Sequence, residues 1–149
     1  MTPLPAPAGR ARSKAVATWL ALVGGSLGLH RFYLHGVRDP WAWLHPLPTL
    51  VGAYGFWRMR QFGVDDARGA LLVPFLGVMV AATMLQAIFY GLTSDERWAA
   101  RHGGRAAAAK PAWPTYLAVV IALAVGVSVA VATIAFTAQR YFESRAEIR

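Results

Sequence analysis

The stretch that decides the fold is LGLHRFYLHG, Leu27 to Gly36, in which His30, Arg31, Phe32 and Tyr33 are consecutive. It follows an uncharged run, so a cation and two aromatic rings arrive abruptly in an apolar segment. Such a cluster could be catalytic, could contact nucleic acid, or could mark the point where a helix leaves a lipid bilayer. These alternatives predict different properties for the rest of the chain.

The composition favours a membrane protein. Of the 149 residues, 56% are hydrophobic and only 15% are charged, which is more apolar than an ordinary soluble domain. The formal net charge is +8, but a protein that binds nucleic acid should cluster its cations on one face or helix. Here the cations separate uncharged runs instead. We therefore expect the lipid bilayer as the main partner, no nucleic acid, and a soluble nucleic-acid-binding protein as the remote alternative.

Four runs lack Asp, Glu, Lys and Arg. Crossing a bilayer core of about 30 Å takes roughly 20 helical residues. The last two runs contain Ala70 to Leu92 and Tyr116 to Ala138 and are long enough, whereas the first two need help from flanking residues. The sequence thus predicts an all-α integral membrane protein with four transmembrane helices arranged as two hairpins.

The predicted organisation has five parts. They are a disordered basic leader (1–14), a helical hairpin (15–66), a third membrane helix (67–92), an extramembrane loop with a short interfacial helix (93–114), and a fourth membrane helix with a charged tail (115–149). The leader and the apolar run after it could also be a signal peptide, but the chain continues into amphipathic aromatic sequence. Thr93 and Glu96 have the spacing of a capping box, and Trp98 is the expected anchor of the interfacial helix.

Charge predicts the orientation of this arrangement. Outside the four spans, nine Lys and Arg residues fall on the side of the N-terminus and six on the other side. The positive-inside rule then places both termini in the cytoplasm.

The second predicted span begins with a clear helix start. Asp39 can cap a helix that has Pro40 at its first position. Pro46 and Pro48 remove backbone donors and should kink or restart the helix. We expect an interfacial turn followed by a helix from about Pro48 to Arg60.

No catalytic chemistry is evident. The chain has no cysteine, which excludes thiolate nucleophiles and cysteine metal sites. His30 and His35 are five positions apart, which is not the i, i+4 spacing that places two ligands on one helical face. All seven acidic residues lie outside the predicted hydrocarbon zone. We expect no enzyme, no metal site and no cofactor.

The cluster at His30 fits a helix end at the membrane surface. If the helix continues to Leu34, the first span reaches 20 residues, and Gly36 lets the chain turn. Tyr33 suits the headgroup level, and Arg31 can extend its stem and keep its guanidinium among phosphates. Alternatively, Arg31 makes a bidentate contact that lysine could not reproduce. Its partner is then Asp39 after the turn, or Asp65 or Asp66 if the hairpin brings that end close, and we expect Asp39.

The run GGSLGLHRFYLHG resembles the signature of the TM2 domain family, whose glycine-rich first membrane helix ends in a G-x-H-R-F-Y-L-G-like motif. The resemblance covers about Lys14 to Asp66 and matches at Gly24, Gly28, His30, Arg31, Phe32, Tyr33, Leu34 and Gly36. His35 and the segment RDPWAWLHPLP depart from the pattern. The resemblance implies a small integral membrane protein with no general enzymatic activity, and it implies that Asp65 and Asp66 correspond to an acidic residue at the end of the second helix.

Small residues could form packing faces. Ala118, Ala122, Gly126 and Ala130 recur every fourth position, and Gly24 and Gly28 have GxxxG spacing. Such ridges let helices approach closely, although an Ala- and Gly-rich chain also produces them by chance. We therefore expect a non-catalytic membrane protein that packs against itself or another membrane protein. The resemblance to the TM2 family and the Ala- and Arg-rich composition imply a location in the bacterial inner membrane.

A second function remains open. A small oligomeric channel or transporter is the alternative, because Gln86, Thr83 and Ser128 are polar residues within the predicted spans.

Overall fold

The computed structural model describes residues 12–103 and 113–147, and every regular element in these ranges is a helix. Most of the predicted leader lies outside the described residues. The elements are α1 (Lys14–Gly24), the 3-10 turn η1 (Gly25–Leu27), α2 (Leu29–His35), α3 (Pro40–Leu44), α4 (Pro46–Phe62), α5 (Ala67–Leu92), α6 (Asp95–His102) and α7 (Trp113–Glu147).

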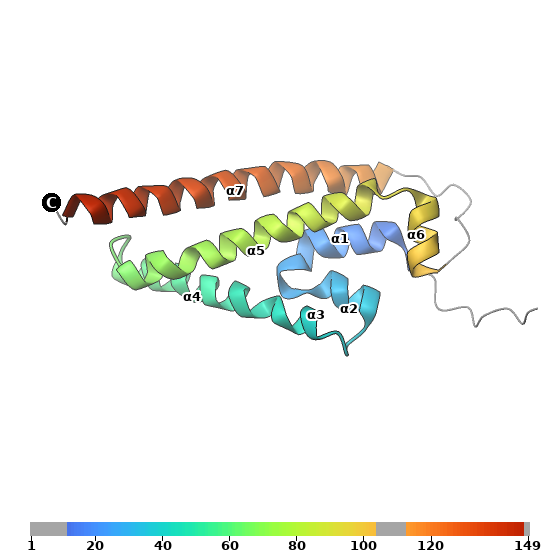
Figure 1. The fold of residues 1–149 in the computed structure, drawn as a ribbon, viewed down its shortest axis with the longest axis horizontal. Helices are drawn as coiled ribbons and strands as arrows, with labels where there is room; N and C mark the ends of the chain where they lie inside the picture. The colour runs from blue at the N-terminus through green and yellow to red at the C-terminus, as the bar shows by residue number, and fades with distance from the viewer. Residues whose placement is uncertain (1–11, 104–112, 148–149) are drawn as a thin grey trace, which may run out of the picture.

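Two helices have the length and composition of membrane spans. α5 has 26 residues and α7 has 35, and by length and composition both could cross a membrane. They lie side by side and antiparallel (Figure 1). Both long apolar helices expected from the sequence are thus present, and each begins three residues before its apolar run, at Ala67 and at Trp113.

The first predicted span is not a continuous helix, so that prediction is wrong. α1 ends at Gly24, and Gly28 has a left-handed backbone with φ 78°. α2 then runs back alongside α1 (Figure 1), and the Ser13 backbone N–H donates to the Tyr33 hydroxyl at 2.9 Å. The glycines permit this reversal because they tolerate backbone that other residues adopt only with strain. We call α1, η1 and α2 the hairpin.

α3 and α4 form nearly one helix. The side chain of Asp39 accepts from the Trp41 backbone N–H, and Pro40 occupies the first turn, as predicted. Pro46 restarts the helix, but His45 keeps helical angles of φ −60° and ψ −42°. The chain therefore stays helical, with one interruption, from Pro40 to Phe62.

Small residues form the interior and large apolar residues face outward. Among the residues that the structure describes, the fully buried hydrophobic residues are all alanines: Ala17, Ala21, Ala42, Ala87, Ala118 and Ala122. Large side chains on α5 and α7 are exposed, among them Leu71, Val78, Leu85, Phe89, Val127, Val131 and Ile134. A water-soluble protein buries such side chains, whereas helices in lipid pack through small residues.

Glycines bring α4 and α5 together. A Cβ at Gly52 would overlap the backbone of Leu76, and a Cβ at Gly55 would come within 2.6 Å of the Leu72 side chain. The two backbones are thus in close contact along this seam.

α6 is the short helix expected after the third span, but its details differ. Its cap is Ser94, whose side chain accepts from the Arg97 backbone N–H, rather than Thr93. Trp98 is only 6% exposed and packs with Ala17 and Leu34. Trp98 therefore holds α6 against the hairpin instead of anchoring it in a lipid surface.

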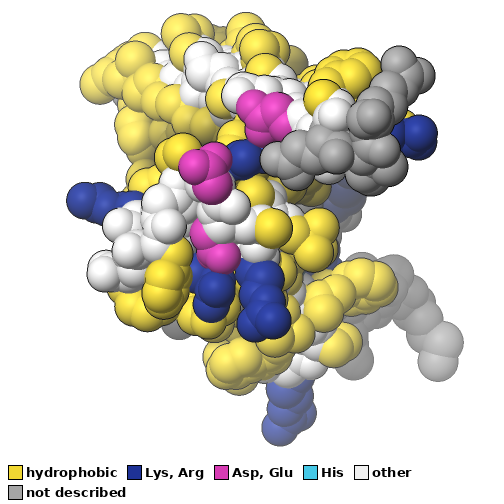
Figure 2. All heavy atoms as spheres, turned by 90° about the vertical axis from the view of Figure 1, so that its left-hand side faces the viewer, with side chains coloured by type: hydrophobic (Ala, Val, Ile, Leu, Met, Phe, Trp, Pro, Cys, Tyr) yellow, Lys and Arg dark blue, Asp and Glu magenta, His cyan; other side chains and the backbone are white. Residues whose placement is uncertain are grey.

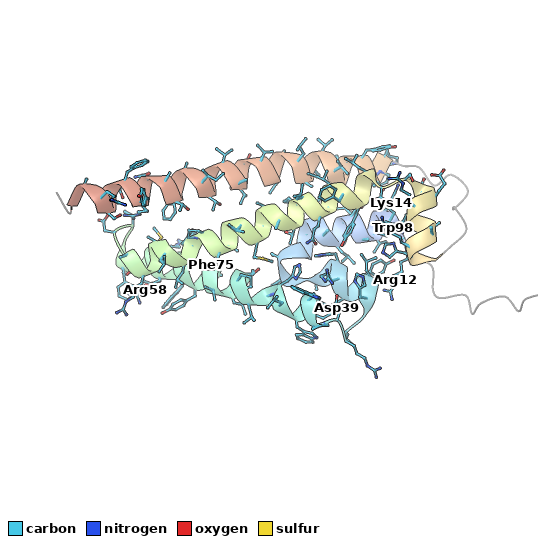
Figure 3. All side chains as sticks on the ribbon, in the orientation of Figure 1. Arg12, Lys14, Asp39, Arg58, Phe75 and Trp98 are labelled. Carbon is cyan, nitrogen blue, oxygen red and sulfur yellow. The ribbon has the colours of Figure 1, made fainter. Side chains whose placement is uncertain are left out.

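The described ends of the chain lie at opposite ends of the bundle. Lys14 Nζ donates to the Thr93 carbonyl at 3.1 Å, whereas Arg140 lies 3.9 Å from Asp65. We call these the α6 end and the Arg58 end; Figure 3 labels Lys14 and Trp98 at the first and Arg58 at the second. The predicted pair of hairpins would have brought both chain ends together, but the reversal at Gly28 prevents this.

Candidate functional site

An ion pair closes the turn between α2 and α3. Arg31 Nε donates to Asp39 Oδ2 at 2.9 Å, and Arg31 Nη2 lies 2.9 Å from the same oxygen. The other oxygen, Oδ1, accepts from the Trp41 backbone N–H at 3.1 Å. The contact between Arg31 and Asp39 expected from the sequence is present, with two guanidinium nitrogens on one oxygen.

The pair sets the charge state of Asp39. Burial alone would raise the pKa of this carboxyl, but the hydrogen bond from Arg31 and the bond from the Trp41 backbone outweigh burial and hold the pKa below its usual value. His35 Nδ1 lies 3.6 Å from the same carboxylate. Asp39 therefore stays ionised and fixes the turn.

A second ion pair closes the turn between α4 and α5. Arg58 Nε and Nη2 donate to the two oxygens of Asp66 at 2.7 and 3.1 Å, which is a bidentate arrangement. The Gly69 backbone N–H also donates to Asp66, at 2.9 Å. The hydrogen bond from Arg58 is the main reason that the pKa of Asp66 is lowered. Of Asp65 and Asp66, it is thus Asp66 that forms the ion pair with Arg58.

The two turns are built alike. Arg31 to Asp39 and Arg58 to Asp66 both read R-x4-G-V-x-D. Their glycines share an unusual backbone, with φ 84° and ψ 178° at Gly36 and φ 93° and ψ 169° at Gly63. In each turn the Asp caps the next helix. We call these segments the two corners.

The repeat of the corners escapes a search for HRFY, because only the Arg, the Gly-Val pair and the Asp recur. A comparison of the two helix-ending segments at a separation of 27 positions reveals it. Figure 2, which looks onto the Arg58 end, shows acidic side chains beside Lys and Arg side chains there.

A buried polar cluster lies behind the first corner. The His30 ring is fully buried, and neither of its nitrogens has a hydrogen-bond partner among the described residues. The Gln86 amide lies beside this ring, and its Oε1 also lacks a partner. The His45 ring centroid is 5.4 Å away, and Tyr90 is 5.8 Å away. The sequence singled out His30 and Gln86 separately but did not bring them together with His45.

The other signature residues pack inside the hairpin and its neighbours. Phe32 contacts Trp43 edge to face with centroids 5.1 Å apart. A Cβ at Gly28 would overlap the Ala42 carbonyl, and a Cβ at Gly24 would overlap Leu29. The Gly24 and Gly28 pair therefore serves contacts within the chain.

The four small residues predicted to form a packing ridge on α7 lie in two different environments. Ala118 and Ala122 are fully buried against the rest of the bundle. Gly126 and Ala130 instead line a groove of about 480 Å³ between α5 and α7, together with Gly77 and Ala81. We call this the α5–α7 groove. Thr133 is the one polar side chain among its lining residues.

Within residues 12–103 and 113–147, no group of three or more His, Asp and Glu side chains is arranged to hold a metal ion.

Comparison with known proteins gives one match. The family model of the TM2 domain matches residues 10–62, a range that contains the hairpin, the first corner, α3 and α4. No curated protein and no solved structure matches the chain. The match to the TM2 domain family therefore covers residues 10–62 of this chain, and α5, α6 and α7 lie outside it.

Proposed function

We propose that this protein is a non-catalytic integral membrane protein that acts by packing its helices against another membrane protein or a second copy of itself, in the bacterial inner membrane. The outward-facing large apolar side chains of α5 and α7 carry this proposal, since water would disfavour such a surface. The TM2 domain and the two long apolar helices support it.

The α5–α7 groove is the surface best suited to a partner helix. Ala81 on α5 and Ala130 on α7 are its small lining residues that face a partner, whereas Gly77 and Gly126 serve the contact between α5 and α7 themselves, with Thr133 and Met84 respectively. In lipid, close van der Waals packing is the main force that joins helices. A partner helix in this groove gains such contacts from two helices at once.

Membrane extraction tests the first part of the proposal. We expect the full chain to remain in the membrane fraction after washes with high salt and with alkaline carbonate, and to be released by mild detergent. Release by high salt alone would contradict membrane integration and would favour the nucleic-acid alternative, because salt weakens contacts with phosphates.

Cross-linking tests the packing role, and the absence of native cysteine makes it direct. Ala130→Cys places a thiol in the groove, and Val131→Cys places one on the adjacent exposed surface. We expect a short reagent with one maleimide and one photoreactive diazirine to join Ala130→Cys to a second copy or to another membrane protein, because the diazirine inserts into bonds of a neighbour that has no thiol, and we expect Val131→Cys to give much less cross-linked product. Equal cross-linking, or none from either variant, would contradict the proposal.

A second candidate function, a small oligomeric channel or transporter, is favoured by one observation. His30 and Gln86 leave buried polar atoms without partners, and intramembrane polar groups often line transport paths. Thr83 and Ser128 give this function less support, since the Thr83 hydroxyl already donates to the Val80 carbonyl and Ser128 is exposed. Flux through liposomes that Gln86→Leu abolishes and Thr83→Val preserves would establish it, and an absence of flux would reject it.

A further inference from the structure

We propose that three helical segments, α3–α4, α5 and α7, cross the bilayer, while the hairpin enters from the α6 end and returns to the same face. The two described ends of the chain then lie on opposite sides of the membrane. This inference rests on the proposed membrane function and specifies how the molecule contacts the two lipid surfaces.

The hairpin returns to the level at which it starts. Beyond the bond from Ser13 to Tyr33, the guanidinium of Arg12 lies 5.4 Å from the Tyr33 ring centroid. Leu34 packs with Ala17 and with Trp98 of α6. The 11 residues of α1 extend about 17 Å, roughly half of a 30 Å bilayer core. The hairpin is therefore too short to cross.

α4 and α5 both contact the tip of the hairpin. Backbone that is not helical can lie at membrane depth only where protein or water satisfies it. A Cβ at Gly25 would come within 2.7 Å of Thr83 on α5. On the other side, Thr49 Oγ1 of α4 donates to the Ser26 carbonyl at 2.6 Å. Because α4 and α5 cover the tip, its irregular backbone is compatible with membrane depth.

The two corners mark the two membrane surfaces. From Pro40 to Phe62 the segment between them has 23 residues, which extend about 34 Å as a helix and match a bilayer core of about 30 Å. Each corner carries an ionised Arg–Asp pair, which favours the headgroup region over hydrocarbon. α4 alone has only 17 residues, so α3 supplies the length that it lacks.

Exposed tryptophans agree with these boundaries. Trp41 and Trp43 at the start of α3–α4 are 61% and 62% exposed, and Trp57 near its end is 52% exposed. Tryptophan is enriched at both membrane interfaces, where its ring is partly solvated. α3–α4 thus has an aromatic anchor near each corner.

Contacts described above also place α5, α6 and α7 relative to the two membrane surfaces. α5 leads from the second corner to the α6 end, and α7 leads back to the Arg58 end (Figure 1). Ser13, the first corner and α6 therefore share one side of the membrane. The second corner and the end of α7 share the other.

Single-cysteine labelling tests this arrangement in the full chain. We would introduce cysteine at five exposed positions: Ser13, Val37, Val64, Glu96 and Ser144. A maleimide that cannot cross membranes is added to sealed vesicles before or after permeabilisation. We expect Ser13→Cys, Val37→Cys and Glu96→Cys to react as one class, and Val64→Cys and Ser144→Cys to react as the opposite class. Ala17→Cys is fully buried and should react only after denaturation, which verifies that the labelled protein is folded.

Other labelling patterns would overturn the inference in distinct ways. If Val37→Cys reacts on the side opposite Ser13→Cys, the first segment crosses completely and the arrangement of two hairpins is restored. If Val64→Cys is labelled from the same side of the membrane as Val37→Cys, α3–α4 does not cross. Reaction of all five positions without permeabilisation, together with release by the carbonate wash, would instead reject the membrane function itself.

Discussion

At the scale of single residues, Arg31 and Arg58 perform the same task at opposite ends of one helical segment. Arg58 spans both oxygens of Asp66, whereas Arg31 places two nitrogens on one oxygen of Asp39 and leaves the other for the helix cap. Both depend on the planar guanidinium, because a lysine ammonium on its flexible stem cannot reproduce two fixed donors.

Arg31→Lys should therefore lower the thermal stability of the detergent-solubilised protein. Since Arg31 and Asp39 contact each other directly, the double variant with Asp39→Asn should lose less than the sum of the two single losses. The control is Arg38→Lys, which changes a neighbouring exposed arginine and should be nearly silent. Additive losses from Arg31→Lys and Asp39→Asn would show that the pair does not act as a unit.

Asp66 predicts a dependence of stability on pH. Its folded-state pKa lies below the ordinary 3.8, so the pair contributes fully above that value, and its contribution is lost as the pH falls through the folded-state pKa. Unfolding of the wild type should become easier as the pH falls below about 4, and Asp66→Asn should flatten this part of the profile. Asp65→Asn removes an exposed carboxylate whose nearest described cation, on Arg140, is 3.9 Å away, and should leave the profile unchanged. A wild-type profile with no loss of stability over this range would refute the assignment.

At the scale of elements, the sequence predicted the helices that local signals define. Uninterrupted apolar runs predicted α5 and α7, and the Asp39–Pro40 pair predicted the start of α3. The reversal of the hairpin was not predictable in this way, because the run from Ala15 to Leu29 is apolar on both sides of the turn. The contacts that enclose this turn come from later parts of the chain, since Gly28 packs against Ala42 of α3 and Gly25 packs against Thr83 of α5. The burial of Trp98 depends on the hairpin and was missed for the same reason.

The seam between α4 and α5 leads to a test of close packing. Gly52→Ala would force a methyl group into the backbone of Leu76, and such overpacking costs about 1–3 kcal/mol. The free energy of unfolding in mild detergent should fall by about this amount. Ala53→Leu adds more volume one position away, on an exposed surface, and should be tolerated. If Gly52→Ala were as stable as Ala53→Leu, the two helices would not be in backbone contact at this point.

At the scale of the whole molecule, the charges divide almost evenly between the two ends. Among the described residues, six Lys and Arg lie at the α6 end (Arg12, Lys14, Arg31, Arg38, Arg97 and Arg101) and five at the Arg58 end (Arg58, Arg60, Arg68, Arg140 and Arg145). The predicted excess of nine over six assumed that the first segment crosses, and it counted all 15 Lys and Arg, four of which (Arg10, Arg105, Lys110 and Arg149) lie outside the described residues. Once the hairpin returns, the described charges give only a weak preference for one orientation.

A small number of charge substitutions should therefore be enough to change which end of the molecule faces the cytoplasm. Replacing Arg97 and Arg101 with Gln removes two exposed cations from the α6 end and should increase the fraction of molecules whose C-terminus is cytoplasmic. The matched pair Arg60→Gln and Arg68→Gln removes two exposed cations from the Arg58 end and should shift that fraction the opposite way. A reporter fused after Arg149 measures both. Shifts in the same direction would refute control by charge.

The length of α7 has a structural consequence. Its 35 residues form a rod of about 52 Å, and the part after Arg140 continues past the turn where α4 meets α5. This part holds its own helical contacts, since Arg140 Nη1 donates to Glu143 at 3.2 Å and Arg145 Nη2 donates to the Tyr141 hydroxyl at 3.0 Å. The seven residues of α7 after Arg140 therefore project about 10 Å beyond the contact between Arg140 and Asp65, as a charged helix end.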